Sequence, residues 1–378
     1  NFLNSNSHAM TSVANASKLV TSCSQIIPRE DPVYGTPCAR SSHGTSVIHD
    51  EKKDLTTVFI YGGEATARVP LDSQIQTFWC ATSNENGEWQ WKFIKPKTEG
   101  HHSHPPERIG HAQTTVSNRY IYIFGGRSGI DMNESALCDL WMFDTQTLEW
   151  TEILCPPDES SDNDRTILWP EARSFHCMLA IDDSNGFYMF GGCGAKSGRL
   201  ADLYKFDVIS QKWTFYGSAA PGLRGRGGAN LIQCEKKLLA VVGGFAGEEL
   251  GDAKLFDMEC GLWLPTGEGK DVIENVISPR SVCVSGSFLL DEKRFGVIFG
   301  GEIDPSEKGH EGAGCFGNDI LLLESSDDAI LVEVVPAQHD DWPECRGWSD
   351  GDTNQNKLYF YGGLSGDDEH PTRLKDLW

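Results

Sequence analysis

The chain has 378 residues, and 55 acidic against 32 basic side chains give it a formal net charge of −23 with histidine neutral. An acidic chain is a poor partner for nucleic acid or for an anionic membrane, because binding to either requires a basic surface. With 39% hydrophobic residues, 11 Trp and 18 Phe, the chain can bury a large core, which excludes disorder for most of its length.

The N-terminal region is expected to contain a tail and one strand. Residues 1–15 are interpreted as a disordered tail or an expression remnant, and residues 17–24, with the run Lys18-Leu19-Val20-Thr21-Ser22, as a β-strand. The first 30 residues lack a basic stretch followed by an apolar core, and no run reaches the roughly 18 to 20 apolar residues of a membrane-spanning helix. The 12 cysteines are scattered singly, without a CxxC pair. We therefore expect a protein with reduced thiols in the cytoplasm or nucleus.

A repeat becomes visible when the double glycines are aligned. Each follows an apolar, β-rich run, and successive pairs lie 52 to 66 residues apart: FIYGG (Gly62), YIFGG (Gly125), YMFGG (Gly191), AVVGG (Gly243), VIFGG (Gly300) and YFYGG (Gly362). This spacing is typical of kelch repeats, in which each unit is a four-stranded propeller blade. The sequence therefore predicts an all-β fold, a six-bladed kelch β-propeller.

The predicted propeller is one domain over residues 16–378, with its last blade built from both ends of the chain. Lys375-Asp376-Leu377-Trp378 matches Cys138-Asp139-Leu140-Trp141, the start of a third strand, so the fourth strand of the last blade is missing there. An unpaired edge is unfavourable, so we expect the N-terminal strand to close the ring. The blades are placed near residues 38–95, 106–155, 171–217, 224–266, 279–335, and 344–378 plus 17–24.

Two further patterns recur with the blades. An arginine precedes each double glycine by 16 to 22 residues: Arg40, Arg108, Arg173, Arg226, Arg280 and Arg346. Six guanidinium groups near one channel mouth would suit sulfate, phosphate or carboxylate, although such residues often satisfy loop carbonyls and neighbouring acids instead. Downstream, three blades carry Phe seven residues before Trp, a spacing that brackets the turn between the outer strands: Phe143 and Trp150, Phe206 and Trp213, Phe256 and Trp263.

Several short motifs together resemble one kelch family. They are Gly300-Gly301-Glu302-Ile303, His310-Glu311-Gly312-Ala313-Gly314, Arg346-Gly347-Trp348 and Gly243-Gly244-Phe245. With them, almost all of residues 16–378 resembles the nitrile-specifier, epithiospecifier and thiocyanate-forming proteins of plants. That resemblance implies a cytosolic propeller that binds Fe(II) without haem and directs the breakdown of an unstable, sulfated, sulfur-containing metabolite.

The same resemblance implies site residues. Glu302 and His310 match the ends of the family's Glu-x3-Asp-x3-His iron motif, while the central position is Ser306 and the nearest aspartate is Asp304. Two carboxylates and a histidine on one loop would form a facial triad with open positions on Fe(II), so we predict a metal site at Glu302, Asp304 and His310. Arg108, Arg173 and Trp348 occupy positions implied to contact the anionic substrate. The alternative is that the two acids pair with channel arginines and His310 caps a turn.

Two functions remain open from the sequence. The first is a specifier-like metalloprotein in which Fe(II) assists breakdown or rearrangement of a small anionic, sulfur-containing metabolite. The second is a non-catalytic module that binds another protein, the commoner role of kelch repeats.

Overall fold

The computed structural model describes residues 22–72, 77–95, 104–129, 136–155, 168–181, 185–218, 222–265, 272–326, 329–338 and 341–378, with the side chains of His310 and Ser326 left out. Within these ranges the regular structure is almost entirely antiparallel strand, with a short 3-10 helix, η2 (Gly309–Glu311). None of the helical structure in the described ranges is long and apolar enough to cross a membrane.

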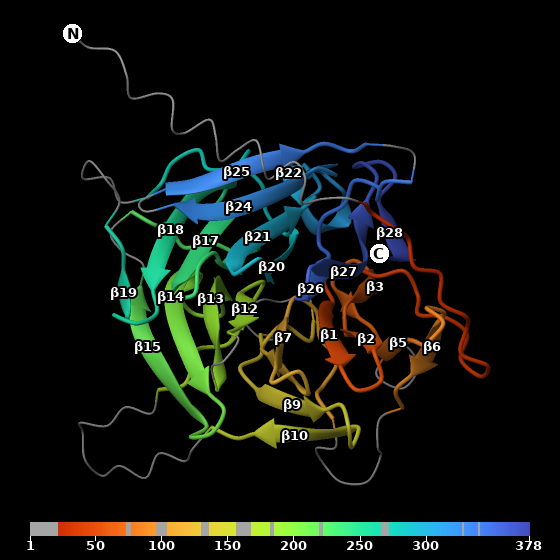
Figure 1. Ribbon diagram of the computed structural model, residues 1–378. Helices are drawn as coiled ribbons and strands as arrows, with labels where there is room; N and C mark the ends of the chain where they lie inside the picture. Colours follow the sequence, from red (N-terminus) through yellow and green to blue (C-terminus); the bar gives the residue numbers. More distant parts are fainter. Residues whose placement is uncertain are drawn as a thin grey trace.

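The described strands form six main sheets in chain order around a central axis (Figure 1). The first three sheets contain β1 (Gly44–Asp50), β2 (Leu55–Tyr61), β5 (Phe78–Ser83) and β6 (Trp89–Phe93); β7 (Ala112–Val116), β8 (Tyr120–Phe124), β9 (Leu140–Asp144) and β10 (Glu149–Ile153); and β11 (Arg173–Ser174), β12 (Cys177–Ala180), β13 (Gly186–Gly194), β14 (Gly198–Asp207) and β15 (Lys212–Ser218).

The other three sheets contain β16 (Asn230–Gln233), β17 (Leu238–Phe245), β18 (Glu249–Asp257) and β19 (Leu262–Trp263); β20 (Val284–Leu290), β21 (Lys293–Phe299), β24 (Ile320–Ser326) and β25 (Ala329–Val335); and β26 (Asp350–Asn354), β27 (Lys357–Ser365) and β28 (Thr372–Leu377). Two small hairpins follow double glycines: β3 (Glu64–Thr66) with β4 (Val69–Pro70), and β22 (Glu302–Asp304) with β23 (Cys315–Phe316).

The inner strands touch in a closed cycle, which makes the fold a propeller. β1 contacts β7, β7 contacts β12, and the contacts continue through β16, β20 and β26 back to β1. Figure 1 shows these strands near the centre, with β6, β10, β15, β19 and β25 toward the rim. The core lies between neighbouring sheets. In one such cluster Phe124 and Leu140 of the second sheet pack against Phe187, Met189 and Phe206 of the third.

The double glycines join each blade to the next. At the first blade, Gly63 N–H donates to the Arg108 carbonyl oxygen of the second blade at 3.0 Å, and a Cβ on Gly62 would lie 2.7 Å from that oxygen. Both glycines have positive φ, a conformation that side chains disfavour. Equivalent hydrogen bonds follow at every blade boundary, the last from Gly363 to Arg40. The double glycines are therefore required because the backbones of neighbouring blades come too close to leave room for side chains.

The outer strands confirm the predicted Phe–Trp pairs. Phe143 lies opposite Trp150, Phe206 opposite Trp213 and Phe256 opposite Trp263, with ring centroids 4.9 to 5.2 Å apart. Each pair holds the outer hairpin of a blade together.

The described part of the N-terminal segment contacts the last blade. Residues 17–21 of the expected closing strand lie outside the described residues. The described contact with β28 is made by Ile26, whose N–H donates to the Leu377 carbonyl at 2.8 Å in an isolated bridge. Arg29 then pairs with β6 of the first blade through Trp89 and Trp91. The segment therefore crosses from the last blade to the first.

Candidate functional site

The repeated arginines form the framework of the channel mouth. Five of them make ion pairs with an aspartate of their own blade at 2.5 to 2.7 Å: Arg108–Asp139, Arg173–Asp202, Arg226–Asp252, Arg280–Asp319 and Arg346–Asp376. All six also donate to the carbonyl of the first glycine in their own blade. These contacts connect the start of the first strand with the end of the second and the start of the third.

Arg108 and Arg173 are locked in this framework, which argues against the predicted anion contact. Both side chains are fully buried. Arg108 donates to both oxygens of Asp139 and to the carbonyls of Pro106 and Gly125, and Arg173 makes the equivalent contacts. Four of the five donors of each guanidinium are thus engaged inside the protein. We assign both residues to the blade framework.

The residues two positions after these arginines form a closed backbone ring, here called the crown. Its members are Ser42, Gly110, Phe175, Gly228, Val282 and Trp348. The N–H of each donates to the carbonyl of the member in the preceding blade at 2.7 to 2.9 Å, and Ser42 closes the ring on Trp348. All six residues have φ between 48° and 60°, in the left-handed region. Four of them are not glycine, so the surrounding contacts must hold the strained backbone in place.

Two aromatic side chains of the crown meet over the channel. Phe175 and Trp348 are the third and sixth of its six members and so lie on opposite sides of the axis, yet their ring centroids are 5.3 Å apart in an edge-to-face arrangement. The Arg127 guanidinium lies 5.1 Å from the centroid of the Phe175 ring. Trp348, which the sequence predicted as a substrate contact, therefore lies at the channel mouth.

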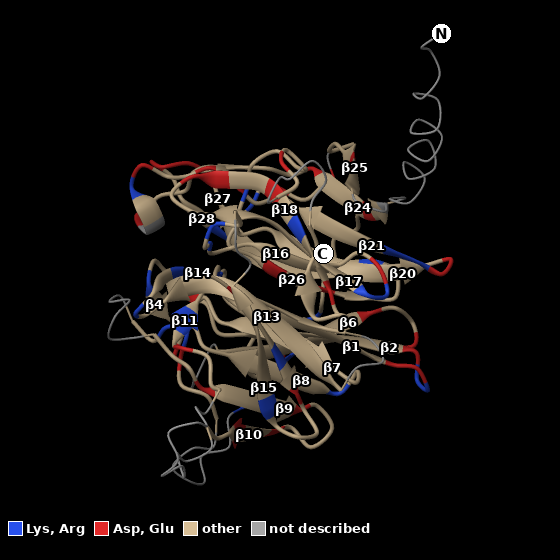
Figure 2. Ribbon diagram, turned by 90° about the vertical axis from the view of Figure 1, so that its left-hand side faces the viewer, with Lys and Arg blue, Asp and Glu red and all other residues tan. Residues whose placement is uncertain are grey.

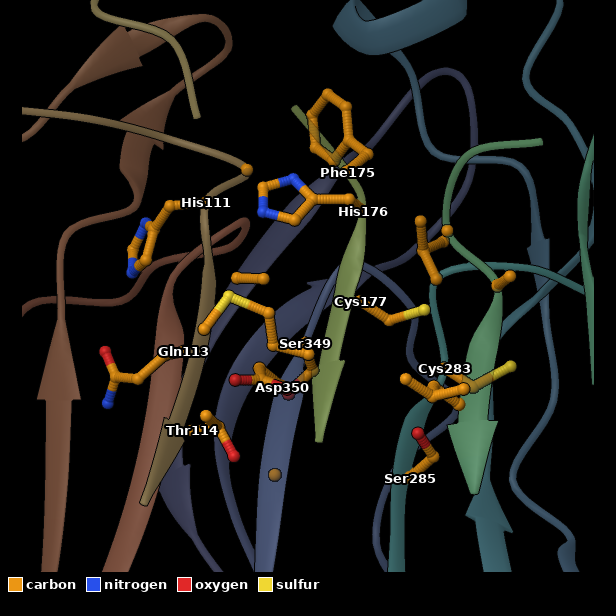
Figure 3. Close-up of a pocket in the computed structure, with 18 of the residues that line it drawn as sticks. His111, Gln113, Thr114, Phe175, His176, Cys177, Cys283, Ser285, Ser349 and Asp350 are labelled. Atoms are coloured by element: carbon orange, nitrogen blue, oxygen red, sulfur yellow. The ribbon is translucent and has the colours of Figure 1, made fainter. Parts of the chain in front are cut away.

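A cavity of about 130 Å³ extends along the channel below the crown. Figure 3 places Phe175 and His176 at one end of this cavity, and Asp350, Thr114 and Ser285 farther along it. Two thiols, Cys177 and Cys283, also line the cavity. Burial raises the pKa of each thiol to about 12, so both stay protonated and unreactive at neutral pH.

Three histidines that follow the framework arginines line the upper cavity. His43, His111 and His176 are buried, and each packs edge-on against an aromatic ring of the preceding blade. Burial and the nearby Arg40 and Arg108 guanidiniums lower the pKa of His43 and of His111 to about 3. The histidines are therefore neutral across the physiological pH range.

The predicted metal segment lies beside the mouth. Glu302 is buried at the start of β22. Burial raises its pKa to about 7, although hydrogen bonds from Trp348, Ser306 and Gly314 act to lower it. Asp304, two residues on, is exposed. Glu249 of the fourth blade approaches both acids; burial raises its pKa to about 8, and its carboxylate oxygens have no well-formed hydrogen bond.

The predicted metal site is not tested by the described residues. No set of three ligand side chains among the described residues is placed to hold one ion. The side chain of His310, the last residue of the predicted motif, lies outside the described residues. The iron site at Glu302, Asp304 and His310 stays a prediction, and we derive no chemical step through iron.

Apart from Trp348, sequence reasoning missed the crown residues and the acids of the channel. The signal for the crown is present, because each member lies two residues after a repeated arginine. Asp350 follows the last crown residue by two positions and carries no motif of its own. Its place in the cavity depends on packing between β26 and β1.

Comparisons with known proteins identify the fold and the relatives. Residues 58–370 match the family model described as Attractin/LZTR1 beta-propeller. The chain is 25% identical over 338 residues to the N-(sulfonatooxy)prop-2-enimidothioate sulfolyase of Thlaspi arvense, covering 82% of this chain and 83% of the relative. It is 30% identical over 287 residues to Kelch domain-containing protein 3 of Rattus norvegicus, covering 72% and 68%.

A solved structure supports the same architecture. The structure of YjhT superposes with a TM-score of 0.59 over 90% of this chain and 95% of its own, at 14% sequence identity. At this identity the likeness concerns the fold alone.

Proposed function

The chain belongs to the Attractin/LZTR1 β-propeller family, and from this premise we propose that it is a binding module whose protein partner docks at the channel mouth. The observation that carries the proposal is the Phe175–Trp348 pair, which presents two large half-buried rings across the axis. Aromatic residues of this kind contribute a large share of binding energy in protein interfaces. The six repeated arginines are engaged in the framework, and the Arg127 guanidinium lies against the Phe175 ring at the mouth.

The overall charge agrees with a protein partner. Figure 2 shows acidic and basic segments interspersed over the loops, without the continuous basic surface that nucleic acid would need. Beside the mouth lie the buried Glu302 and the exposed Asp304. A partner with a basic or apolar projection matches this surface better than an anionic one.

The mouth proposal is tested by comparing three baits in affinity capture: wild type, Trp348→Ala and Phe215→Ala. Phe215 is an exposed aromatic on the outer strand β15 and serves as the matched control. We expect wild type and Phe215→Ala to capture the same proteins, and the captured amount to be at least tenfold lower with Trp348→Ala. The captured proteins, once purified, should also bind purified wild type in calorimetry. Equal capture by all three folded baits would refute the mouth as the docking surface.

A second candidate function is a specifier-like activity on a small sulfur-containing metabolite, assisted by Fe(II). It is favoured by the sulfolyase relative and by the desolvated carboxylates of Glu302 and Glu249, whose raised pKa values indicate that a nearby cation would stabilise their ionised forms. Glu302, Asp304 and His310 are the proposed ligands.

Anaerobic calorimetric titration with Fe(II) tests this second candidate. We expect one site in the wild type and none in His310→Ala, with unchanged melting temperatures in both proteins. Equal binding by the two proteins, or none by either, would remove the iron site and leave the binding module alone.

A further inference from the structure

The second blade brings two cysteines to the same end of its outer hairpin. β9 and β10 pair in antiparallel register, and the last pair at this end is Leu140 opposite Ile153 (Figure 1). Continuing that register by two residues sets Cys138 opposite Cys155. Opposite residues of antiparallel strands lie about 4.5 to 5.5 Å apart between their Cα atoms, within the range of about 4.4 to 6.8 Å that a disulfide spans.

The two thiols also belong to the same face of the hairpin. Side chains alternate along a strand, so residues two positions apart point to the same side. Leu140 and Ile153 are buried together in the core between the second and third blades. Cys138 and Cys155 therefore continue that face beyond the edge of the core, where both are exposed. An oxidant in solution can reach both sulfur atoms.

Hydrogen bonds fix the backbone around Cys138. The Asp139 carbonyl accepts the Gly125 N–H at 3.2 Å, which attaches the segment before β9 to the end of β8. The Cys138 carbonyl accepts the Trp169 indole N–H at 2.7 Å. The fold itself therefore holds this thiol at the end of the hairpin, beside the point where the chain leaves the blade after Cys155.

The electrostatics of Cys138 agree with a nearby second thiol. Burial raises the pKa of the Cys138 thiol, and the charges of Asp139 and Cys155 raise it further, while Lys196 lowers it. The effect of Cys155 means that the two sulfur atoms are close enough to interact. Since the thiolate is the reactive form, Cys138 reacts slowly at neutral pH and faster as the pH rises.

We propose that Cys138 and Cys155 are a reversible dithiol–disulfide site that locks the outer hairpin of the second blade under oxidising conditions. This site is independent of the docking proposed at the channel mouth. A bridge between these residues ties the start of β9 to the end of β10. It therefore opposes opening of the hairpin at the edge of the core that this blade shares with the third.

Glutathione disulfide is the class of oxidant that balances the reaction. One cysteine thiolate attacks a glutathione sulfur and releases one glutathione as its thiolate. The second cysteine thiolate then attacks the protein sulfur of the mixed disulfide and releases the other glutathione. The two protons of the cysteine thiols pass to the two glutathione thiolates. The cysteines lose two electrons, and glutathione disulfide gains them.

Peptide mass mapping after equilibration with reduced and oxidised glutathione at pH 8 tests the bridge. The full chain is compared with Cys138→Ser, Cys155→Ser and Cys260→Ser, and the remaining thiols are alkylated before digestion. Cys260 is exposed in the turn between β18 and β19 and is the matched control for the loss of one surface thiol. We expect peptides joined through Cys138 and Cys155 in wild type and in Cys260→Ser, and their separation by dithiothreitol.

The single variants separate a specific bridge from general oxidation. In Cys138→Ser, Cys155 should stop at the glutathione adduct, because the opposite thiol has been removed, and Cys155→Ser should leave the adduct on Cys138. Absence of the joined peptides in excess glutathione disulfide overturns the site. Bridges from either residue to other cysteines in equal yield overturn it as well.

Melting temperatures test the locking of the hairpin. Oxidised wild type and Cys260→Ser should melt a few degrees above their reduced forms, because the bridge restricts the unfolded chain. Cys138→Ser and Cys155→Ser should show no such difference, and all four reduced proteins should melt alike. No shift in wild type, or equal shifts in all four proteins, would contradict the locking role. The Trp348 capture experiment uses reduced protein, so the two proposals fail separately.

Discussion

The arginine–aspartate pairs are the most constrained side chains around the channel. Burial opposes ionisation of Asp139, but the Arg108 guanidinium and hydrogen bonds from Arg108 and Trp141 hold its pKa below the usual range. A buried pair of this kind contributes little net stability compared with an apolar pair, yet removal of one partner leaves an uncompensated charge. Replacing Arg108 should therefore affect stability differently depending on whether this side chain binds an anion or holds the blade together.

Replacement of Arg108 by Met separates these two roles. We expect Arg108→Met to lower the free energy of unfolding by about 3 to 5 kcal/mol, because Asp139 loses its buried partner. Arg119→Met removes the more exposed pair with Asp144 and should cost less than about 1 kcal/mol. Urea denaturation measures both changes. A cost for Arg108→Met no larger than that for Arg119→Met would contradict the framework role.

Glu249 gives the fold a dependence on pH. Burial and the nearby charges of Glu302 and Asp304 raise its pKa from 4.5 to about 8, although a hydrogen bond from Ser281 acts to lower it. The folded state therefore binds this proton more tightly than the unfolded state, and stability falls as pH rises from about 4.5 to 8. Glu249→Gln should reduce the fall in melting temperature between pH 5 and 8. An identical pH profile in the variant would disprove this assignment.

At the scale of the strands, the double glycine forms the contact between blades. A Cβ on Gly125 would lie 2.6 Å from the Arg173 carbonyl oxygen of the next blade, whereas a Cβ on Gly198 meets nothing within 4 Å. Both glycines have positive φ, at 63° and 71°. The two positions therefore share backbone strain and differ in close contact.

Alanine at these two positions measures the contact. Gly198→Ala should cost about 1 kcal/mol, the usual penalty for a left-handed alanine, and Gly125→Ala should cost clearly more because the backbone of the neighbouring blade must also move. Thermal denaturation of the two variants provides the comparison. Equal losses of stability would mean that the double glycine is needed only for its positive φ and not for the close contact between blades.

For the whole molecule, stability depends on joining the last blade to the first. Gly363 and Ser42 make the two backbone closures near the axis, and Ile26 and Arg29 connect β28 with β6 near the rim. A propeller whose ring is opened exposes the apolar faces of two blades at once. The N-terminal segment is thus expected to stabilise the entire ring.

Two truncations test this expectation. Removal of residues 1–35 deletes the contacts of Ile26 and Arg29 and should lower the melting temperature by several degrees, since about 1 kcal/mol corresponds to a few degrees in a chain of this size. Removal of residues 1–21 leaves those contacts in place and should have a smaller effect. If the shorter truncation destabilises the protein as much as the longer one, the closing contact is made by residues before Ser22, in the first part of the strand predicted at 17–24.

The sequence alone determined the propeller, because its signals are local or strictly periodic. Double glycines and β-rich runs report a hydrogen-bonding or packing requirement that recurs in all six repeats, and the Phe–Trp pairs report one that recurs in three of them. Only the tertiary structure decided the roles of Arg108 and Arg173, since their aspartate partners lie about 30 residues away and no local pattern connects the two positions. It also decided the Phe175–Trp348 contact and the placement of Asp350 in the cavity. The Phe175–Trp348 contact joins opposite blades, and the placement of Asp350 depends on packing between the last blade and the first. Both therefore exist only once the ring is closed.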